Sequence, residues 1–289
     1  MVDDTWHAGE LELQQSVGLK ELMAEIGAKV IRSYMPDQHR SFFHQLPFIV
    51  VGSVDGDKNV WVGIRSGGNG FIESPEPSIL QIKGIGVPGD PVERGIKRNG
   101  AIGLLGIELD TKRRNRVNGL IIEVQEKMIE IEVNQSFGNC PKYIEEYYLN
   151  SLRVEPGTVR ELDGLSHQNH KLISSSERFF VASFAEIGNQ RQVDVSHRGG
   201  KPGFVEIDSN GWLKIPDYVG NNFFATLGNI LLNAKAGLTF IDFDNKTMLQ
   251  MTGEAFVLPT KGSESSNGDA PRYWRFKPVK LYSQDIALN

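Results

Sequence analysis

The residues with the clearest chemical potential stand at the end of one predicted strand, Ser196-His197-Arg198-Gly199-Gly200. A guanidinium and a hydroxyl, followed by glycines that let the backbone approach a ligand, are typical of a phosphate site. A further strand over residues 213–215 leads to Gly220-Asn221, where we expect a helix with an asparagine cap. Free N–H groups at a helix start also favour an anion. The same pattern fits an ordinary glycine turn between strands.

The composition is that of a soluble globular chain. Its 289 residues, 39% hydrophobic and 23% charged, suffice for one large domain or two of ordinary size. No apolar run of roughly 18 residues could span a membrane, and the acidic N-terminus has no signal-peptide core. A single cysteine favours a reducing compartment, so we expect a cytoplasmic protein. The net charge of −5 argues against a dedicated nucleic-acid binder.

The two halves of the chain carry one pattern of residues. Arg198 follows Arg65 by 133 positions, and residues 203–206 follow the similar residues 70–73 by the same interval. Chance identities would scatter over many intervals, so we infer an internal duplication. Further matches run at an interval of 134: Asn99 with Asn233, Gly103 with Gly237, and Gly119 with Gly253.

Each repeat contains about six short strands and one late helix, which is typical of a small antiparallel barrel. We therefore expect a mainly β protein with accessory helices, built from two tandem split β-barrels. Residues 1–40 form an N-terminal helical segment, 41–150 the first barrel unit, 151–176 a linker and 177–289 the second unit. Two such barrels side by side leave a groove, where ligand sites are common.

Local patterns predict further elements. Apolar residues at helical spacing over residues 9–34 predict two helices separated near Gly18. Residues 55–59 predict a hairpin turn, and residues 144–149 a short helix. A loop rich in Ser and Gly covers residues 260–270. His167 and His170 resemble half of a metal site, but structural zinc needs four ligands, so we expect no metal.

The two copies differ at the positions that could hold a ligand. The second copy has the strand end 196–200 and the amides of residues 220–222. The first copy keeps Arg65 in register but has Asp90 at the start of its helix. A carboxylate beside a phosphate would repel it, so the second copy is the better candidate for a phosphate site.

Several short motifs, taken as a set, are distinctive. In the second copy they are residues 196–204, 213–217, 220–221, 227–233 and 237–240; in the first they are residues 35–40, 113–119 and 139–144. As a set they resemble the pyridoxamine 5′-phosphate oxidase-like family of FMN-binding split barrels. The similarity spans roughly residues 5–258. It is closest in kind to a subgroup with two barrels in one chain, sometimes joined to ferredoxin reductase-type modules.

The resemblance implies FMN bound between the two barrels, with Cys140, Lys142 and Tyr143 near the isoalloxazine edge. The family often has a basic residue where Asn222 and Phe223 stand, so one phosphate contact is missing. The substrate-binding residues of pyridoxamine-phosphate oxidases are not recognisable, so that activity is not implied. The remaining residues of the implied cofactor site are Arg65, Ser196, His197, Arg198, Gly199, Asn221, Asn222 and Asn229.

We therefore expect an FMN-dependent oxidoreductase that acts on a small organic substrate, with its catalytic residues unassigned. The flavin would carry the redox chemistry, and the protein would supply the pocket and its electrostatics. One alternative is a non-catalytic flavin-binding or electron-relay module that works with a reductase or a ferredoxin-type partner. Another is a structural double barrel without a cofactor. Pairing of two chains as a homodimer is also open.

Individual residues have simpler interpretations as well. Arg198 could form a surface ion pair with Asp194 or Glu206. Cys140 could be a small buried hydrophobic residue, as most free cysteines are. Tyr143 could donate a proton or a hydrogen bond to a substrate, or merely cap a helix. Each of these interpretations depends on where the fold places the side chain.

Overall fold

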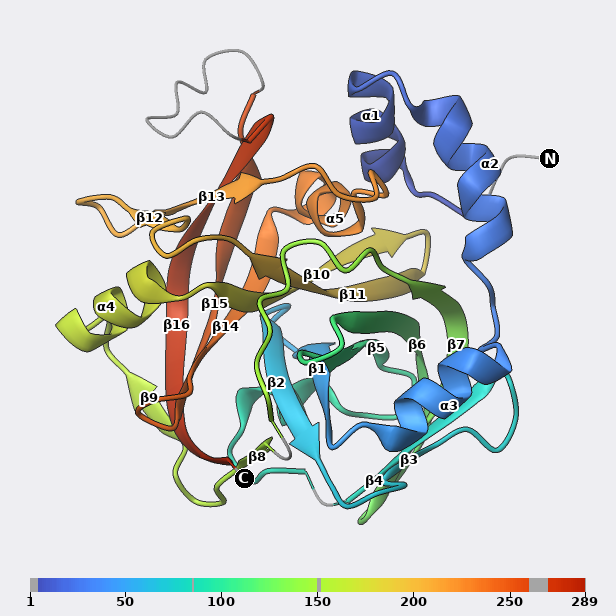
Figure 1. Ribbon diagram of the computed structural model, residues 1–289, viewed down its shortest axis with the longest axis horizontal. Helices are drawn as coiled ribbons and strands as arrows, with labels where there is room; N and C mark the ends of the chain where they lie inside the picture. The colour runs from blue at the N-terminus through green and yellow to red at the C-terminus, as the bar shows by residue number, and fades with distance from the viewer. Residues whose placement is uncertain (1–4, 85, 150–151, 260–269, 289) are drawn as a thin grey trace.

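The computed structural model describes residues 5–84, 86–149, 152–259 and 270–288 (Figure 1). The predicted loop over residues 260–270 lies outside them except for its last residue. The chain is mainly β, with two antiparallel sheets and a few helices, as the sequence predicts. None of the described helices combines the length and the apolar character needed to cross a membrane.

The first sheet has seven strands in the order β2-β1-β5-β6-β7-β4-β3. The predicted turn joins β1 to β2, where the carboxylate of Asp55 accepts hydrogen bonds from the backbone of Asn59 and the indole of Trp61. The strands are β1 (Phe48–Val54), β2 (Val60–Ser66), β3 (Ile72–Glu73), β4 (Ile79–Lys83), β5 (Ala101–Glu108), β6 (Arg113–Gln125) and β7 (Met128–Gly138).

The second sheet repeats this order as β11-β10-β14-β15-β16-β13-β12. Each of these strands has a counterpart at the same place in the first sheet, so the predicted fold class of two tandem units is confirmed. The strands are β10 (Arg178–Ile187), β11 (Gln190–Gly199), β12 (Glu206–Ile207), β13 (Leu213–Asp217), β14 (Lys235–Asp242), β15 (Thr247–Val257) and β16 (Arg272–Leu288).

The segment expected to be a linker contains regular structure. The short strands β8 (Leu152–Val154) and β9 (Arg160–Leu162) both pair with β16 of the second sheet. They are followed by α4 (His167–Ser175), which begins with a capping box at Ser166. Much of this segment is therefore attached to the second sheet.

Strand alternation divides the core into three parts. On β1, Ile49 and Val51 face a core enclosed by the first sheet, whereas Phe48 and Val50 face the second sheet. A matching core lies inside the second sheet. Because both faces of the central strands are buried, these strands are apolar throughout. The two rolled sheets therefore pack against each other and bring β6 close to β11.

The N-terminal helices match the prediction in part. α1 (Ala8–Ser16) and α2 (Lys20–Val30) are separated at Gly18, whose φ of +69° suits glycine. α3 (Asp37–Gln45) was not predicted; its phenylalanines pack into the first core. In the repeats the helical elements are the 3₁₀ helix η1 (Pro91–Gly95) and α5 (Ala225–Asn233).

The helix predicted over residues 144–149 is wrong. Residues 139–149, here called the connecting segment, leave β7 and have no regular secondary structure (Figure 1). Tyr143 has a left-handed backbone with φ of +64°, and Ile144 is buried between the sheets. Contacts with both units thus override the local helical propensity.

The helix α1 crosses α5 at a pair of glycines (Figure 1). A Cβ added to Gly9 would lie 2.2 Å from the carbonyl oxygen of Gly228. One added to Gly228 would lie 2.7 Å from the backbone nitrogen of Glu10. Real Cβ atoms do not approach backbone so closely, so this crossing requires glycine on both helices.

We expect Gly9→Val to lower the free energy of unfolding by about 2–3 kcal/mol, because it overpacks the helix crossing. Gly164→Val is the control, since a Cβ at Gly164 would meet nothing within 4 Å. Urea unfolding of the two variants measures the difference. Equal stability would contradict the close crossing of α1 and α5.

Candidate functional site

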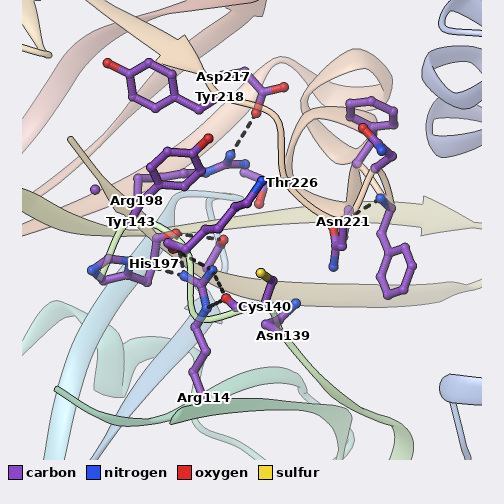
Figure 2. Close-up of a pocket in the computed structure, with 18 of the residues that line it drawn as sticks. Arg114, Asn139, Cys140, Tyr143, His197, Arg198, Asp217, Tyr218, Asn221 and Thr226 are labelled. Carbon is purple, nitrogen blue, oxygen red and sulfur yellow. Dashed lines mark hydrogen bonds and ion pairs between the residues drawn. The ribbon is translucent and has the colours of Figure 1, made fainter. Parts of the chain in front are cut away.

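One pocket lies where the two sheets meet, and both units line it (Figure 2). The first unit contributes Arg114 and Arg116 on β6 and the start of the connecting segment. The second contributes the end of β11 and the chain between β13 and α5. Its volume of about 90 Å³ is well below the roughly 300 Å³ of pockets that enclose a drug-sized ligand. A phosphate-sized group fits this space better than a whole cofactor.

Most of the site residues predicted from the sequence meet at this pocket. They come from β11, from the loop before α5 and from the connecting segment, which lie far apart in the chain. Their roles toward a cofactor stay predictions. The residues are Cys140, Lys142, Tyr143, Ser196, His197, Arg198, Gly199, Asn221 and Asn222.

Arg65 and Asn229 do not line this pocket. The guanidinium of Arg65 is paired with Glu93, at 2.5 and 3.2 Å. The side-chain oxygen of Asn229 accepts a hydrogen bond from His7 at 2.8 Å, and its amide donates to Ser183 at 3.1 Å. Both side chains are held by protein partners, and their roles toward a cofactor stay predictions.

Two arginines that the sequence reasoning did not assign are central to the pocket. Arg114 and Arg116 stand two residues apart on β6, so they share one face of the strand. That face is the one turned toward β11 of the other unit. The alternation was visible in the sequence, but the packing of β6 against β11 of the second unit was not.

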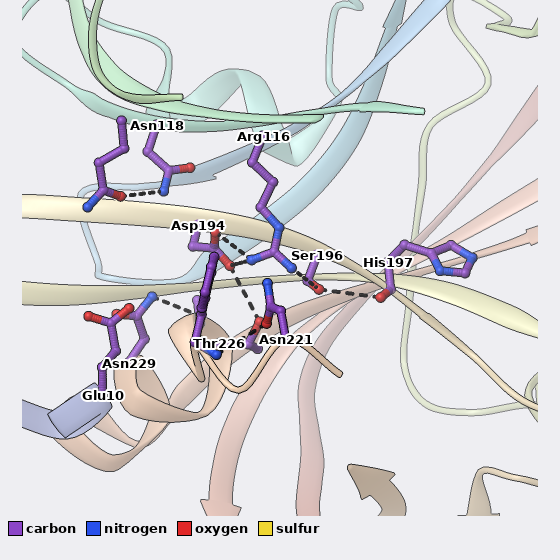
Figure 3. A network of polar contacts seen from close by, with 12 residues as sticks. Glu10, Arg116, Asn118, Asp194, Ser196, His197, Asn221, Thr226 and Asn229 are labelled. Carbon is purple, nitrogen blue, oxygen red and sulfur yellow. Dashed lines mark hydrogen bonds and ion pairs between the residues drawn. The ribbon is translucent and has the colours of Figure 1, made fainter. Parts of the chain in front are cut away.

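Arg116 organises one wall of the pocket (Figure 3). Its Nη1 lies 2.9 Å from both carboxylate oxygens of Asp194, and its Nη2 donates to the hydroxyl of Ser196 at 2.7 Å. Thr226 at the start of α5 donates to the same carboxylate at 3.4 Å. This buried ion pair fixes β6, β11 and α5 relative to one another.

Arg114 differs because it has no carboxylate partner among the residues that the structure describes (Figure 2). Its Nε and Nη2 donate to the carbonyl of Cys140 at 3.1 and 2.7 Å. Burial, together with the nearby charges of Arg116 and Arg198, lowers the pKa of Arg114 to about 9. The side chain is still charged at neutral pH, and that charge is not compensated.

His197 is a buried neutral donor beside Arg114. Arg114 Nη1 donates to its Nδ1 at 3.2 Å, so the ring proton is on Nε2. Burial and the charges of Arg114, Arg178 and Arg198 hold the pKa of His197 well below its usual range. Its Nε2 finds no acceptor within the described part of the chain.

Arg198 forms an ion pair, but with a different residue from those expected. Its Nη1 lies 2.8 Å from Asp217, which also pairs with Arg272 at 3.1 Å. The expected partners are engaged elsewhere, Asp194 with Arg116 and Glu206 with Lys214. Because one carboxylate serves two guanidinium groups, positive charge remains in excess here.

The helix start lies later than predicted. α5 begins at Ala225, and Asn221 instead closes a turn by accepting from the backbone of Phe223 at 3.2 Å. Asn222 and Phe224 have left-handed backbones, with φ of +58° and +62°. The helix has no side-chain cap, and its first residues line the pocket. Its N-terminal N–H groups therefore add positive potential.

The connecting segment forms the opposite wall. The ring of Tyr143 stacks on Tyr218 with centroids 5.2 Å apart, and its hydroxyl donates to the carbonyl of Val219 at 3.2 Å. A Cβ on Gly199 would lie 1.9 Å from the carbonyl oxygen of Tyr143, so the segment docks directly on β11. Cys140 is exposed and is not a core residue.

The charges of the lining decide what the pocket can hold. Four cationic side chains line it, whereas two carboxylates balance them, Asp217 in the lining and Asp194 behind Arg116. Within the described ranges no group of three or more His, Cys, Asp or Glu side chains could hold a metal ion. The excess of cations suits an anion such as a phosphate.

No family model and no curated protein matches the chain. Solved structures match parts of it. They include a protein assigned as a pyridoxamine 5′-phosphate oxidase from Lactobacillus delbrueckii, with 17% identity and a TM-score of 0.30 over 37% of this chain and 95% of that one. An FMN-binding protein from Syntrophomonas wolfei matches with 13% identity and a TM-score of 0.28 over 44% of this chain and 95% of that one.

A third match is the heme storage protein HutZ from Vibrio cholerae, with 12% identity and a TM-score of 0.27 over 43% of this chain and 94% of that one. Each of the three covers less than half of this chain and nearly all of the other protein. At such TM-scores the likenesses carry no argument about a cofactor or a reaction. The group of proteins that the sequence resembles is nevertheless represented among the matched structures.

Proposed function

We propose that the chain is an FMN-binding oxidoreductase acting on a small organic substrate, and that the pocket between the units holds the phosphate of FMN. The observation that carries this proposal is the charge on Arg114, which stands beside Arg116 and Arg198 and has no carboxylate partner among the described residues. A partly buried cation among other cations is costly unless an anion joins it.

The groups around Arg114 support the same proposal. Arg198 and the first residues of α5 line the pocket beside it. A phosphate accepts several hydrogen bonds at once and carries the opposite charge. Arg114, Arg198 and the N-terminus of α5 would therefore hold it, with His197 behind Arg114 accepting one of its hydrogen bonds.

The remainder of the cofactor would lie beyond the 90 Å³ pocket. An aromatic surface adjoins it, formed by the stacked rings of Tyr143 and Tyr218. Flat apolar surfaces suit a fused ring system. A bound flavin would supply the hydride or electron transfer. The chain's own side chains would bind the phosphate and orient the ring beside the exposed thiol of Cys140.

The absorbance spectrum of the full chain as purified tests this proposal. We expect flavin bands, and release of FMN when the protein is denatured. A Soret band from haem would overturn the proposal, and so would a colourless protein that takes up no added FMN, which would leave a structural double barrel. Reduction of the bound flavin by NAD(P)H alone would support an oxidoreductase. A requirement for a separate reductase would indicate an electron-relay module instead.

A further inference from the structure

The common strand order identifies a place in the molecule that corresponds to the pocket with the roles of the units exchanged. There, β2 of the first unit replaces β11, and β15 of the second unit replaces β6. The registers put Gln250 where Arg116 stands and Met248 where Arg114 stands. The counterparts on β2 are Gly63 for Ser196, Ile64 for His197 and Arg65 for Arg198.

Carboxylates of the protein itself take the place of a ligand anion at this counterpart place. The carboxylate of Asp90 is 1% exposed and accepts hydrogen bonds from Gln250 at 2.9 Å, Gln284 at 3.0 Å and the backbone of Val92 at 2.9 Å. A Cβ on Gly63 would lie 2.7 Å from Val92. An internal carboxylate thus takes the hydrogen bonds there. A cavity of about 270 Å³ lies beside Arg65, but Glu93 and Glu126 line it as well, and their charges would repel an anion.

The counterpart place also lacks the excess of positive charge. Ile64 and Met248 belong to the apolar core between the sheets, whereas the residues that they correspond to are a buried donor and a cation. Arg65, the counterpart of Arg198, is charged, but the carboxylate of Glu93 lies 2.5 Å away and neutralises it. The excess of positive charge that favours an anion in the pocket is therefore not found among the described residues of the counterpart place.

We infer that each chain has one phosphate site and binds one FMN, although its fold contains two equivalent places. This inference rests on the proposed function. The first unit supplies Arg114 and Arg116 and the second supplies Ser196, His197 and Arg198, so one complete site needs both units of one chain. The second place has become a polar cluster around Asp90 that joins the units.

Titration of the full-length chain with FMN, followed by flavin fluorescence at protein concentrations well above Kd, tests the inference. We expect saturation at one FMN per chain. The double variant Arg65→Gln/Glu93→Gln removes the ion pair as a unit and should keep that stoichiometry, with Kd unchanged within about twofold. Arg114→Gln, in the pocket, should weaken binding at least tenfold.

Saturation at two FMN per chain would overturn the inference and leave the proposed function in place. Loss of binding in the double variant, with its melting temperature unchanged, would also overturn it, because Arg65 would then belong to a ligand site. No binding by the unmodified chain would overturn the proposed function, and the inference with it.

Discussion

Replacement of Arg114 by Gln is expected to weaken FMN binding by about 10–100-fold, the effect of losing a charge-assisted hydrogen bond. Glutamine keeps a donor that can reach the carbonyl of Cys140, so the connecting segment stays attached while the charge is lost. The thermal stability should change little, because losing the hydrogen bond to His197 is offset by removing a charge that has no carboxylate partner among the described residues. Flavin fluorescence titration measures the change in Kd.

Arg113→Gln is the matched control for this variant. Arg113 precedes Arg114 on β6 but belongs to the other face, where it lies over the ring of Phe42 and 3.8 Å from Glu108. Its substitution should leave Kd unchanged. Similar losses of affinity in the two variants would mean that FMN binding depends on the total positive charge of β6 and not on a contact in the pocket.

A pH-dependent loss of stability is expected from Glu10, which is buried where α1 meets α5 (Figure 3). Burial raises the pKa of Glu10 to about 8, with a further contribution from the charge of Asp194. Between its ordinary pKa and 8 the folded chain holds a proton that the unfolded chain has released. The free energy of unfolding therefore falls as pH rises through this window, by several kcal/mol in total.

Glu10→Gln should remove this loss. An amide oxygen can still accept the hydrogen bond that the backbone of His7 gives to Glu10 at 3.0 Å, but it carries no charge. Urea unfolding at about pH 6 and pH 9 should therefore show a much smaller difference for the variant. Glu12→Gln, on the exposed side of the same helix, should behave like the unmodified chain. A parallel loss of stability in Glu10→Gln would contradict the assignment.

Much of the fold could be read from the sequence because its signals are local or repeated. The repeated interval between Arg65 and Arg198 and their neighbours predicted two similar units, and the two sheets do share one strand order. The helix expected over residues 144–149 failed because Ile144 and Tyr143 are fixed by distant partners. Local propensity cannot report such contacts.

The sequence indicated some of the residues that line the pocket but not the two arginines of β6. The end of β11 was identified because Ser196, His197 and Arg198 are adjacent in the chain. Arg114 became visible only when the packing of the two units placed β6 beside β11. Arg65 occupies the position in the first repeat that Arg198 occupies in the second. The repeat alone does not predict that Glu93, on η1, forms an ion pair with Arg65.

The most direct test of the phosphate site compares FMN with riboflavin, which differs from it only by lacking the phosphate. The Kd of the full chain for each flavin, measured in one buffer, isolates the contribution of that group. A pocket built around Arg114, His197 and Arg198 predicts that FMN binds at least about 100-fold more tightly, and that Arg114→Gln narrows the gap. Equal affinity for the two flavins would contradict a phosphate site in this pocket.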